Sequence, residues 1–97
     1  MAKILVADGN IGAADVLAAA LRLQGHAVRT GYTGKQCLQL SHEFRPHVVL
    51  LRKKSIDSQA ARQLRAEAPV ISIGPEGDVP EPIDMLALIQ LIRQTLG

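Results

Sequence analysis

The sequence has 97 residues, which is enough for one domain with a single core and too few for two. Hydrophobic residues make up 47% of it and charged residues 21%, as in ordinary globular proteins. The only aromatic residues are Tyr32 and Phe44, which leaves few platforms for base stacking, and a net charge of +2 does not indicate a polyanion partner. We therefore expect no direct contact with nucleic acid.

The sequence also indicates a compartment. Cys37 is the only cysteine, so no internal disulfide can form and a reducing environment is expected. The amino terminus reaches a polar turn after a few apolar residues, unlike a signal peptide, and no apolar run is long enough to cross a membrane. We expect one cytoplasmic domain over residues 1–97, without membrane contact.

In the first half of the chain, predicted strands alternate with predicted helices. Residues 3–7 form a short apolar run that predicts a strand. Asn10 can cap a helix that continues to Gly25, a residue suited to a left-handed helix stop. Residues 27–31 predict a second strand, and Thr33 can cap a second helix.

The second half of the chain continues the alternation. Residues 48–52 and 70–74 are predicted strands, and their continuous apolar runs suit strands that are covered on both faces. Either Ser55 or Asp57 can begin the helix between them, and a last helix is predicted over residues 83–96. Strands joined by helices predict a parallel sheet with right-handed crossovers and helices on both faces.

The segment between the fourth strand and the last helix leaves no room for a further helix and strand. Its nine residues, 74–82, include two glycines and three prolines. The sheet is therefore predicted to have four strands, or to carry a very short fifth strand around Val79. We expect the edge of the fourth strand to lack cover, unless this proline-rich loop folds over it.

The last helix has apolar residues on two sides. One stripe is predicted to face the sheet, and it consists of Met85, Leu88, Ile89, Ile92 and Leu96. Ile83, Leu86 and Leu91 fall outside that stripe, on a side that is polar in most monomers. We therefore expect these three residues to contribute to a dimer or effector interface beside the fourth strand.

Six segments carry a family resemblance: KILVADGN, LRLQGHAV, GKQCLQL, RPHVVLL, APVISIG and EPIDMLALIQLI. In this order and spacing they resemble the receiver domain of two-component response regulators, over nearly the whole chain. The resemblance implies an α/β fold of the flavodoxin or CheY-like type, with a doubly wound parallel sheet in the order 2-1-3-4. Relative to the family, the fifth strand is expected to be reduced or lost and the fourth helix to be missing.

The resemblance also implies that the family's reactive residues are mostly replaced. In the family, an aspartate after the third strand accepts a phosphoryl group, and an acidic pair after the first strand holds Mg²⁺. A hydroxyl and a lysine then contact the phosphoryl group. In this sequence, Arg52 stands at the phosphoacceptor position, and only Asp8 remains of the acidic pair, with Gly9 beside it. Gly74 and Glu81 stand at the hydroxyl and lysine positions.

These replacements predict a degenerate pocket. A guanidinium cannot form an acyl phosphate, and its charge repels Mg²⁺, so we expect no phosphorylation, no metal and no cofactor. Arg52 and Glu81 reverse the family's charges, so an ion pair between them is expected to close the pocket, with Asp8 as a second partner of Arg52. The other interpretation is a rim of unrelated, solvated charges.

Two further cations, Lys53 and Lys54, follow Arg52 and are expected to be solvated. The alternative is that these three residues and the helix start at Asn10 bind an anion, which makes the chain an anion or nucleotide sensor. The segment DGNIG lacks the glycine pattern of nucleotide sites, so the sensor is the second hypothesis.

No acid, base and nucleophile form a recognisable arrangement, so we predict neither catalytic residues nor an enzyme. The three histidines, His26, His42 and His47, lack the spacing of a metal site, and Cys37 is expected to be a buried, inert thiol. The leading hypothesis is a phosphorylation-independent module for protein–protein interaction in two-component signalling, a phosphorelay or transcription regulation. Its expected partner is another protein or an effector domain, and a homodimer is also expected.

Overall fold

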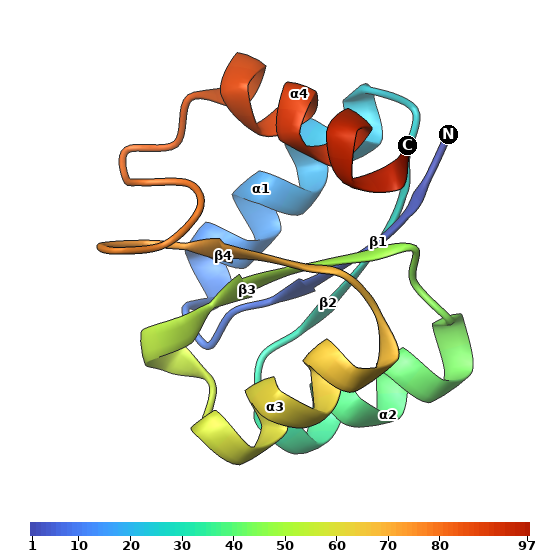
Figure 1. The fold of residues 1–97 in the computed structure, drawn as a ribbon, viewed down its shortest axis with the longest axis vertical. Helices are drawn as coiled ribbons and strands as arrows, with labels where there is room; N and C mark the ends of the chain where they lie inside the picture. The colour runs from blue at the N-terminus through green and yellow to red at the C-terminus, as the bar shows by residue number, and fades with distance from the viewer.

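The computed structural model describes residues 1–97 and alternates strands with helices along the chain (Figure 1). The strands are β1 (Lys3–Ala7), β2 (Ala27–Gly31), β3 (Val48–Arg52) and β4 (Val70–Ile73). The helices are α1 (Ile11–Leu23), α2 (Gly34–Phe44), α3 (Ser58–Glu67) and α4 (Met85–Leu96), and a 3-10 turn, Lys53–Ser55, follows β3. The predicted strands and helices are all confirmed, with small differences at their ends.

The four strands form one parallel sheet in the order β2-β1-β3-β4. β1 is central, since Ile4 lies opposite Val28 of β2 on one side and Val48 of β3 on the other. On the far side of β3, Leu50 lies opposite Ile71 of β4. The predicted α/β class, doubly wound sheet and strand order are therefore confirmed. None of the helices has both the length and the apolar character required to span a bilayer.

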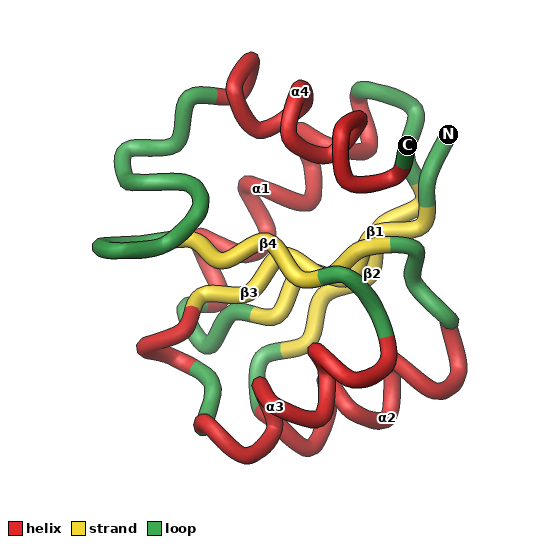
Figure 2. Tube along the Cα trace, in the orientation of Figure 1, coloured by secondary structure: helices red, strands yellow, loops and turns green.

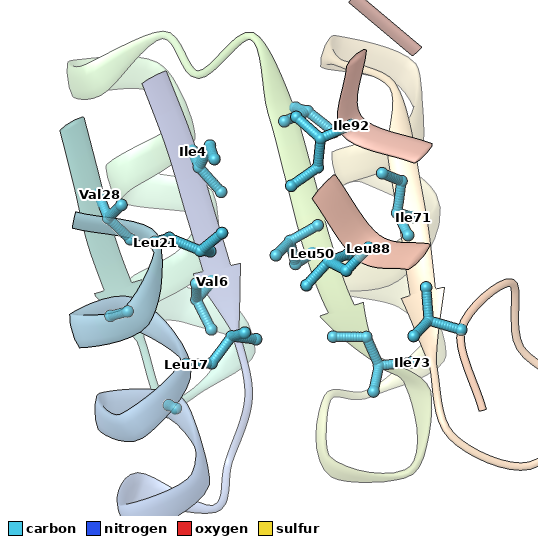
Figure 3. Packing of buried hydrophobic residues seen from close by; sticks show 14 of the residues in the cluster. Ile4, Val6, Leu17, Leu21, Val28, Leu50, Ile71, Ile73, Leu88 and Ile92 are labelled. Atoms are coloured by element: carbon cyan, nitrogen blue, oxygen red, sulfur yellow. The ribbon is translucent and has the colours of Figure 1, made fainter. Parts of the chain in front are cut away.

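Two helices cover each face of the sheet: α1 and α4 lie on one side, and α2 and α3 on the other (Figures 1 and 2). Because successive strand residues point to opposite faces, Ile4 and Val6 belong to the core under α1 and α4, whereas Leu5 belongs to the opposite core. Figure 3 shows Leu88 and Ile92 of α4 reaching toward β3 and β4. α4 thereby shares one face of the sheet with α1, and α2 and α3 cover the opposite face (Figure 1).

Each helix begins at a side-chain cap that the sequence indicates. Asn10, Thr33, Asp57 and Asp84 accept hydrogen bonds from backbone N–H groups in the first turns of α1, α2, α3 and α4. Asp57 therefore begins the third helix, and Ser55 belongs to the 3-10 turn before it.

The loop between β4 and α4 folds along the free edge of β4. Val79 forms a parallel bridge with Ile73, and its N–H donates to the carbonyl of Ser72 at 3.0 Å. The carbonyl of Val79 accepts from the N–H of Gly74 at 3.0 Å, and the Asp78 carboxylate accepts from the N–H of Ser72 at 3.0 Å. The very short fifth strand is confirmed. The expectation of an uncovered edge is wrong, because the loop supplies the hydrogen bonds that a neighbouring strand would make.

The side of α4 that packs against the core is wider than the predicted stripe. Leu88 and Ile92 are buried as expected, but Ile83 and Leu91 are also partly buried and pack against the same core. The expectation that both lie on an uncovered outer face is therefore wrong, because the core beneath α4 contains side chains of the sheet and of α1 and contacts a wide face of the helix. Of the three predicted interface residues only Leu86 is largely exposed, at 73%.

Candidate functional site

The predicted pocket residues come together at the carboxyl end of the sheet. Asp8 directly follows β1, and Arg52 is the last residue of the neighbouring strand β3. The two strands are in register, with Ala7 opposite Leu51, so the residues that follow these positions lie side by side. Glu81 comes from the loop between β4 and α4, which turns back over the same end. In open parallel sheets this end is where ligands are usually bound.

Arg52 lies between two carboxylates. Its Nε donates to Oδ2 of Asp8 at 2.7 Å, and its Nη1 donates to Oε1 of Glu81. The Asp8 side chain is 3% exposed and the Arg52 side chain 16%, so this charge pair is largely withdrawn from solvent. Both ion pairs expected from the sequence are present, and the interpretation as unrelated solvated charges is wrong.

The electrostatics of Arg52 follow from these contacts. Burial by itself lowers the pKa of the guanidinium, but the hydrogen bonds and negative charges of Asp8 and Glu81 outweigh it and raise the pKa above its ordinary value. Arg52 therefore carries its positive charge at neutral pH. A permanent positive charge at this place opposes the binding of any cation.

Both oxygens of Asp8 accept hydrogen bonds from the protein itself. While Oδ2 receives Arg52, Oδ1 accepts from the N–H of Asn10 at 2.9 Å, and the hydroxyl of Ser55 lies 3.3 Å from the same oxygen. The Ser55 hydroxyl has a single proton, and its shorter contact is with the carbonyl of Arg52 at 2.9 Å. The residues present therefore do not fit Mg²⁺, because the one acidic side chain left from the family's pair is already occupied by donors.

Gly9 closes the turn after β1 against the turn after β3. Its N–H donates to Oγ of Ser55 at 2.9 Å. A Cβ at position 9 would lie 2.9 Å from the carbonyl oxygen of Ser55, closer than such atoms approach in proteins, and 3.1 Å from the Cβ of Ser55, which is a tight contact. No side chain, acidic or otherwise, fits at this position unless the two turns separate. Ser55 was not predicted as a pocket residue, since in the sequence it resembles a helix cap.

Gly74 leaves the hydroxyl position without any side chain. It is buried, and its φ of +119° lies in the region that favours glycine. A Cβ there would face Oε1 of Glu81 at 3.8 Å, so Gly74 borders the pocket but offers no donor from a side chain.

The four residues of the anion-site hypothesis have different surroundings. Arg52 directs Nε and Nη1 at carboxylates, and the Asn10 side chain is used as the cap of α1. Lys53 and Lys54 are exposed in the 3-10 turn. The contacts of Arg52 and Asn10 are thus made within the protein, and only the two lysines point their charge at solvent.

The three histidines stand in separate places. Nδ1 of His26 accepts from the N–H of Ala2 at 3.1 Å, and Nδ1 of His47 accepts from the N–H of Lys3 at 3.0 Å, so both tie the start of the chain to the sheet. Burial, the amino terminus and a nearby arginine lower the pKa of His26. His42 pairs with a carboxylate on α3. No group of three or more histidine, cysteine or acidic residues is arranged to hold a metal ion.

Solved structures of receiver domains match this fold over nearly its whole length. The receiver domain of the hybrid histidine kinase CckA is 26% identical, with a TM-score of 0.79, and the match covers 98% of this chain and 99% of that one. CheY4 from Vibrio cholerae is 18% identical, with a TM-score of 0.83 and 99% of both chains covered. No family model and no curated protein matches the sequence.

A longer protein also contains this fold. NtrX from Brucella abortus is 21% identical, with a TM-score of 0.86, and the match covers 98% of this chain but 26% of the NtrX chain. This chain therefore corresponds to about a quarter of that protein. Together these likenesses show that the fold is that of CheY-like receiver domains of response regulators.

Proposed function

We propose that this chain, a CheY-like receiver domain, acts without being phosphorylated, as a module for protein–protein interaction. The observation that carries the proposal is the position of Arg52, whose guanidinium is held between Asp8 and Glu81 where the family has its phosphoacceptor aspartate. The resemblance assigns the position, and the contacts give the physical reason why its chemistry is replaced by a structural ion pair.

The replacement removes each requirement of phosphoryl transfer. Arg52, at the acceptor position, has no carboxylate oxygen that could attack phosphorus. Both oxygens of Asp8 already accept hydrogen bonds from the protein. Without Mg²⁺ nothing neutralises the charge that develops on a transferring phosphoryl group. The pocket of such a domain has one state, instead of an unphosphorylated and a phosphorylated state. A partner therefore binds the domain constitutively.

The partner is proposed to be another protein or an effector domain. In NtrX, the matched receiver fold makes up about a quarter of a longer polypeptide. This supports an arrangement in which residues 1–97 act as a single receiver-like domain beside another domain. A role in two-component signalling or in the control of transcription, in the cytoplasm, is also part of the proposal, as are the absence of enzyme activity and of direct nucleic-acid contact.

The test is phosphorylation by a small phosphodonor. The purified chain is incubated with acetyl phosphate and Mg²⁺ and analysed by intact-mass spectrometry, with an active receiver domain as the positive control. We expect no gain of a phosphoryl group in the wild type. The variant Arg52→Asp is also expected to gain none, because Gly9, Gly74 and Glu81 remain. A Mg²⁺-dependent phosphoryl adduct on the wild type would overturn the proposal.

The anion or nucleotide sensor is the weaker alternative. It requires Arg52 to leave at least one of its two carboxylate partners, and only Lys53 and Lys54 are freely exposed. Calorimetric titration with inorganic phosphate compares the wild type with the double variant Lys53→Ala, Lys54→Ala. Saturable binding that the double variant loses would favour the sensor over the interaction module.

A further inference from the structure

Two cations from neighbouring strands meet at one aromatic ring. Lys3 is the first residue of β1, and Arg29 of β2 lies opposite Leu5 of β1. Because side chains alternate along a strand, all three point to the face that α2 and α3 cover. Nζ of Lys3 lies 5.7 Å and Cζ of Arg29 5.3 Å from the ring centre of Phe44, the last residue of α2. The ring therefore holds two positive charges beside each other near the amino end of the sheet.

His47 fixes the start of β1 beside these two cations. Its N–H donates to the carbonyl of Lys3 at 2.8 Å, and its Nδ1 accepts from the N–H of Lys3 at 3.0 Å. With Nδ1 as an acceptor, the hydrogen of the neutral ring is on Nε2, which makes no hydrogen bond within the chain. The exposed imidazole therefore adds a free donor to the two charges.

Neither cation has an acidic partner within the chain. The ion pairs of the structure are those of Arg52 and of His42, and none of them involves Lys3 or Arg29. Cations often stand at helix ends, where they offset the helix dipole, but these two belong to strands and are exposed. Their positive charge is therefore free for an anionic group of a partner.

The surroundings increase the positive charge at this end of the molecule, where Figure 1 marks N and C. Because the helices run back between parallel strands, their carboxyl ends lie at the amino end of the sheet. Three helices carry an arginine in their last turns: Arg22, Arg65 and Arg93. The acidic residues at this end are Glu43 and Glu67, and Glu67 is already paired. This end is therefore positive, although the whole chain has a net charge of only +2.

We propose that the amino-end cluster, which consists of Lys3, Arg29, Phe44 and His47, is a docking site for an acidic segment of a partner protein. The inference rests on the proposed function as an interaction module and names the chemistry of the partner. Two cations and a neutral donor fit neighbouring carboxylates, as in a peptide with consecutive aspartates or glutamates. Because the ring of Phe44 and the hydrogen bonds of His47 already restrict the cluster, binding requires little further ordering.

An acidic protein segment fits this cluster better than a nucleic acid does. A surface for nucleic acid combines many phosphate contacts with aromatic rings on which bases stack. The ring of Phe44 is already in contact with two cations. Tyr32, the other aromatic residue, donates its hydroxyl to Asp15 and follows the carboxyl end of β2, away from the cluster.

The first test is the binding of a labelled hexaglutamate peptide, measured by fluorescence anisotropy. We expect saturable binding to the wild type that weakens as salt is added. The double variant Lys3→Glu, Arg29→Glu should raise the dissociation constant at least roughly tenfold. The control is Lys53→Glu, Lys54→Glu, which changes the net charge equally at exposed residues of the opposite end and should stay within roughly twofold of the wild type.

A milder variant tests the aromatic ring without reversing any charge. Phe44→Leu keeps an apolar side chain at the end of α2 but removes the ring that holds the two cations. It should weaken the binding of hexaglutamate by roughly two- to fivefold. Circular dichroism of each variant checks that the fold is kept. An unchanged dissociation constant in a folded Phe44→Leu would mean that the ring does not prepare the cluster for binding.

The second test locates the peptide on the wild-type chain by nuclear magnetic resonance. Unlabelled hexaglutamate should shift the amide resonances of the four residues of the amino-end cluster and leave that of Arg52 unchanged. The phosphodonor assay reads the opposite end of the sheet, so either proposal can fail without the other. Binding that is not saturable below roughly 1 mM, equal losses in the two double variants, or shifts centred on Arg52 would overturn the docking site. Tighter binding of a single-stranded hexathymidine than of the peptide would also overturn it, in favour of nucleic acid.

Discussion

Arg52 lies at the carboxyl end of the sheet, between two carboxylates. Its guanidinium links the turn after β1, through Asp8, to the loop before α4, through Glu81. This connection is made by fixed charges in a place with little solvent, where an ion pair holds its geometry but leaves a costly unpaired charge if one partner is removed.

Reversal of this charge should destabilise the fold. Arg52→Asp places a third carboxylate beside Asp8 and Glu81, and we expect the free energy of unfolding to fall by about 3 kcal/mol at neutral pH. The loss should be smaller at about pH 4, where carboxylates begin to be protonated. Chemical denaturation at both pH values measures the difference.

The control for this change is its neighbour. Lys53→Asp makes the same replacement of a cation by a carboxylate, but at an exposed residue of the 3-10 turn, and should change stability by about 0.5 kcal/mol or less. Equal effects of Arg52→Asp and Lys53→Asp would mean that the ion pairs of Arg52 contribute nothing beyond surface charge.

At the scale of single residues, the sequence predicts charges better than packing. The contact of Arg52 with Asp8 and Glu81 follows from reversed signs at positions that the family resemblance brings together. The contact of Gly9 with Ser55 could not be predicted in this way. It depends on how closely two turns approach, and a serine after two lysines equally suits a helix cap.

At the level of structural elements, two turns pack against each other at the carboxyl end of the sheet. The turn after β1 and the turn after β3 meet where Gly9 lies against Ser55. Gly9→Ala should therefore lower the free energy of unfolding by about 1–3 kcal/mol, because the new Cβ needs space that the carbonyl of Ser55 occupies. Denaturation at low micromolar concentration measures the change.

A matched glycine three residues further serves as the control. A Cβ at Gly12, in the first turn of α1, would meet only the side chain of Asn10 at an ordinary 3.7 Å. Gly12→Ala should then stabilise the monomer by about 0.5–1 kcal/mol, because alanine favours a helix more than glycine does. If Gly9→Ala is also neutral or stabilising, the two turns are not closed against each other.

The carboxyl ends of α2 and α3 are joined by Glu67. Its carboxylate accepts from the hydroxyl of Ser41 at 2.7 Å and pairs with His42. These hydrogen bonds, with the positive charge of Arg45, lower the pKa of Glu67 below its ordinary value of 4.5. A carboxyl with a lowered pKa in the folded state stabilises the fold above about pH 4.5, and this contribution is lost as the pH falls through the folded-state pKa.

Glu67→Gln should therefore be less stable than the wild type at neutral pH, and the difference should disappear in acid. Thermal unfolding over a pH series measures it. Glu43→Gln is the control, since Glu43 is exposed on α2 and contacts only the neutral amide of Gln39. If the difference in stability between the wild type and Glu67→Gln is the same at all pH values, the ionised carboxylate of Glu67 does not stabilise the fold.

Elements and their order are predicted well from this sequence, and surfaces less well. β-branched apolar runs, caps and glycine stops fix where each strand and helix lies. By contrast, the coverage of α4 depends on what lies beneath it, so Leu91 is partly buried although its helical position places it outside the main stripe. The exposure of Val16 and Leu23 could not be predicted from the sequence, because apolar residues recur on nearly every side of this helix and mark no single stripe.

The whole molecule is a receiver fold whose sheet is closed by contacts within the chain. The free edge of β4 pairs with Val79, the carboxyl end of the sheet is covered by the contacts of Arg52 and Ser55, and α4 packs on the same face of the sheet as α1. Under the proposed function, the surface available to partners does not depend on a modification. Three of the exposed large apolar side chains, Ile11, Val16 and Leu23, belong to α1.

The closed pocket is tested most directly by nuclear magnetic resonance of the backbone amides. The ¹⁵N-labelled chain is titrated with Mg²⁺ and then with beryllofluoride, an analogue of a bound phosphoryl group. We expect the amide resonances of Asp8, Gly9, Arg52 and Ser55 to stay unchanged in both titrations. Saturable shifts of these resonances that require Mg²⁺, with beryllofluoride adding further shifts, would contradict it, since they would mean that the pocket opens and binds the ligands of a phosphorylated receiver.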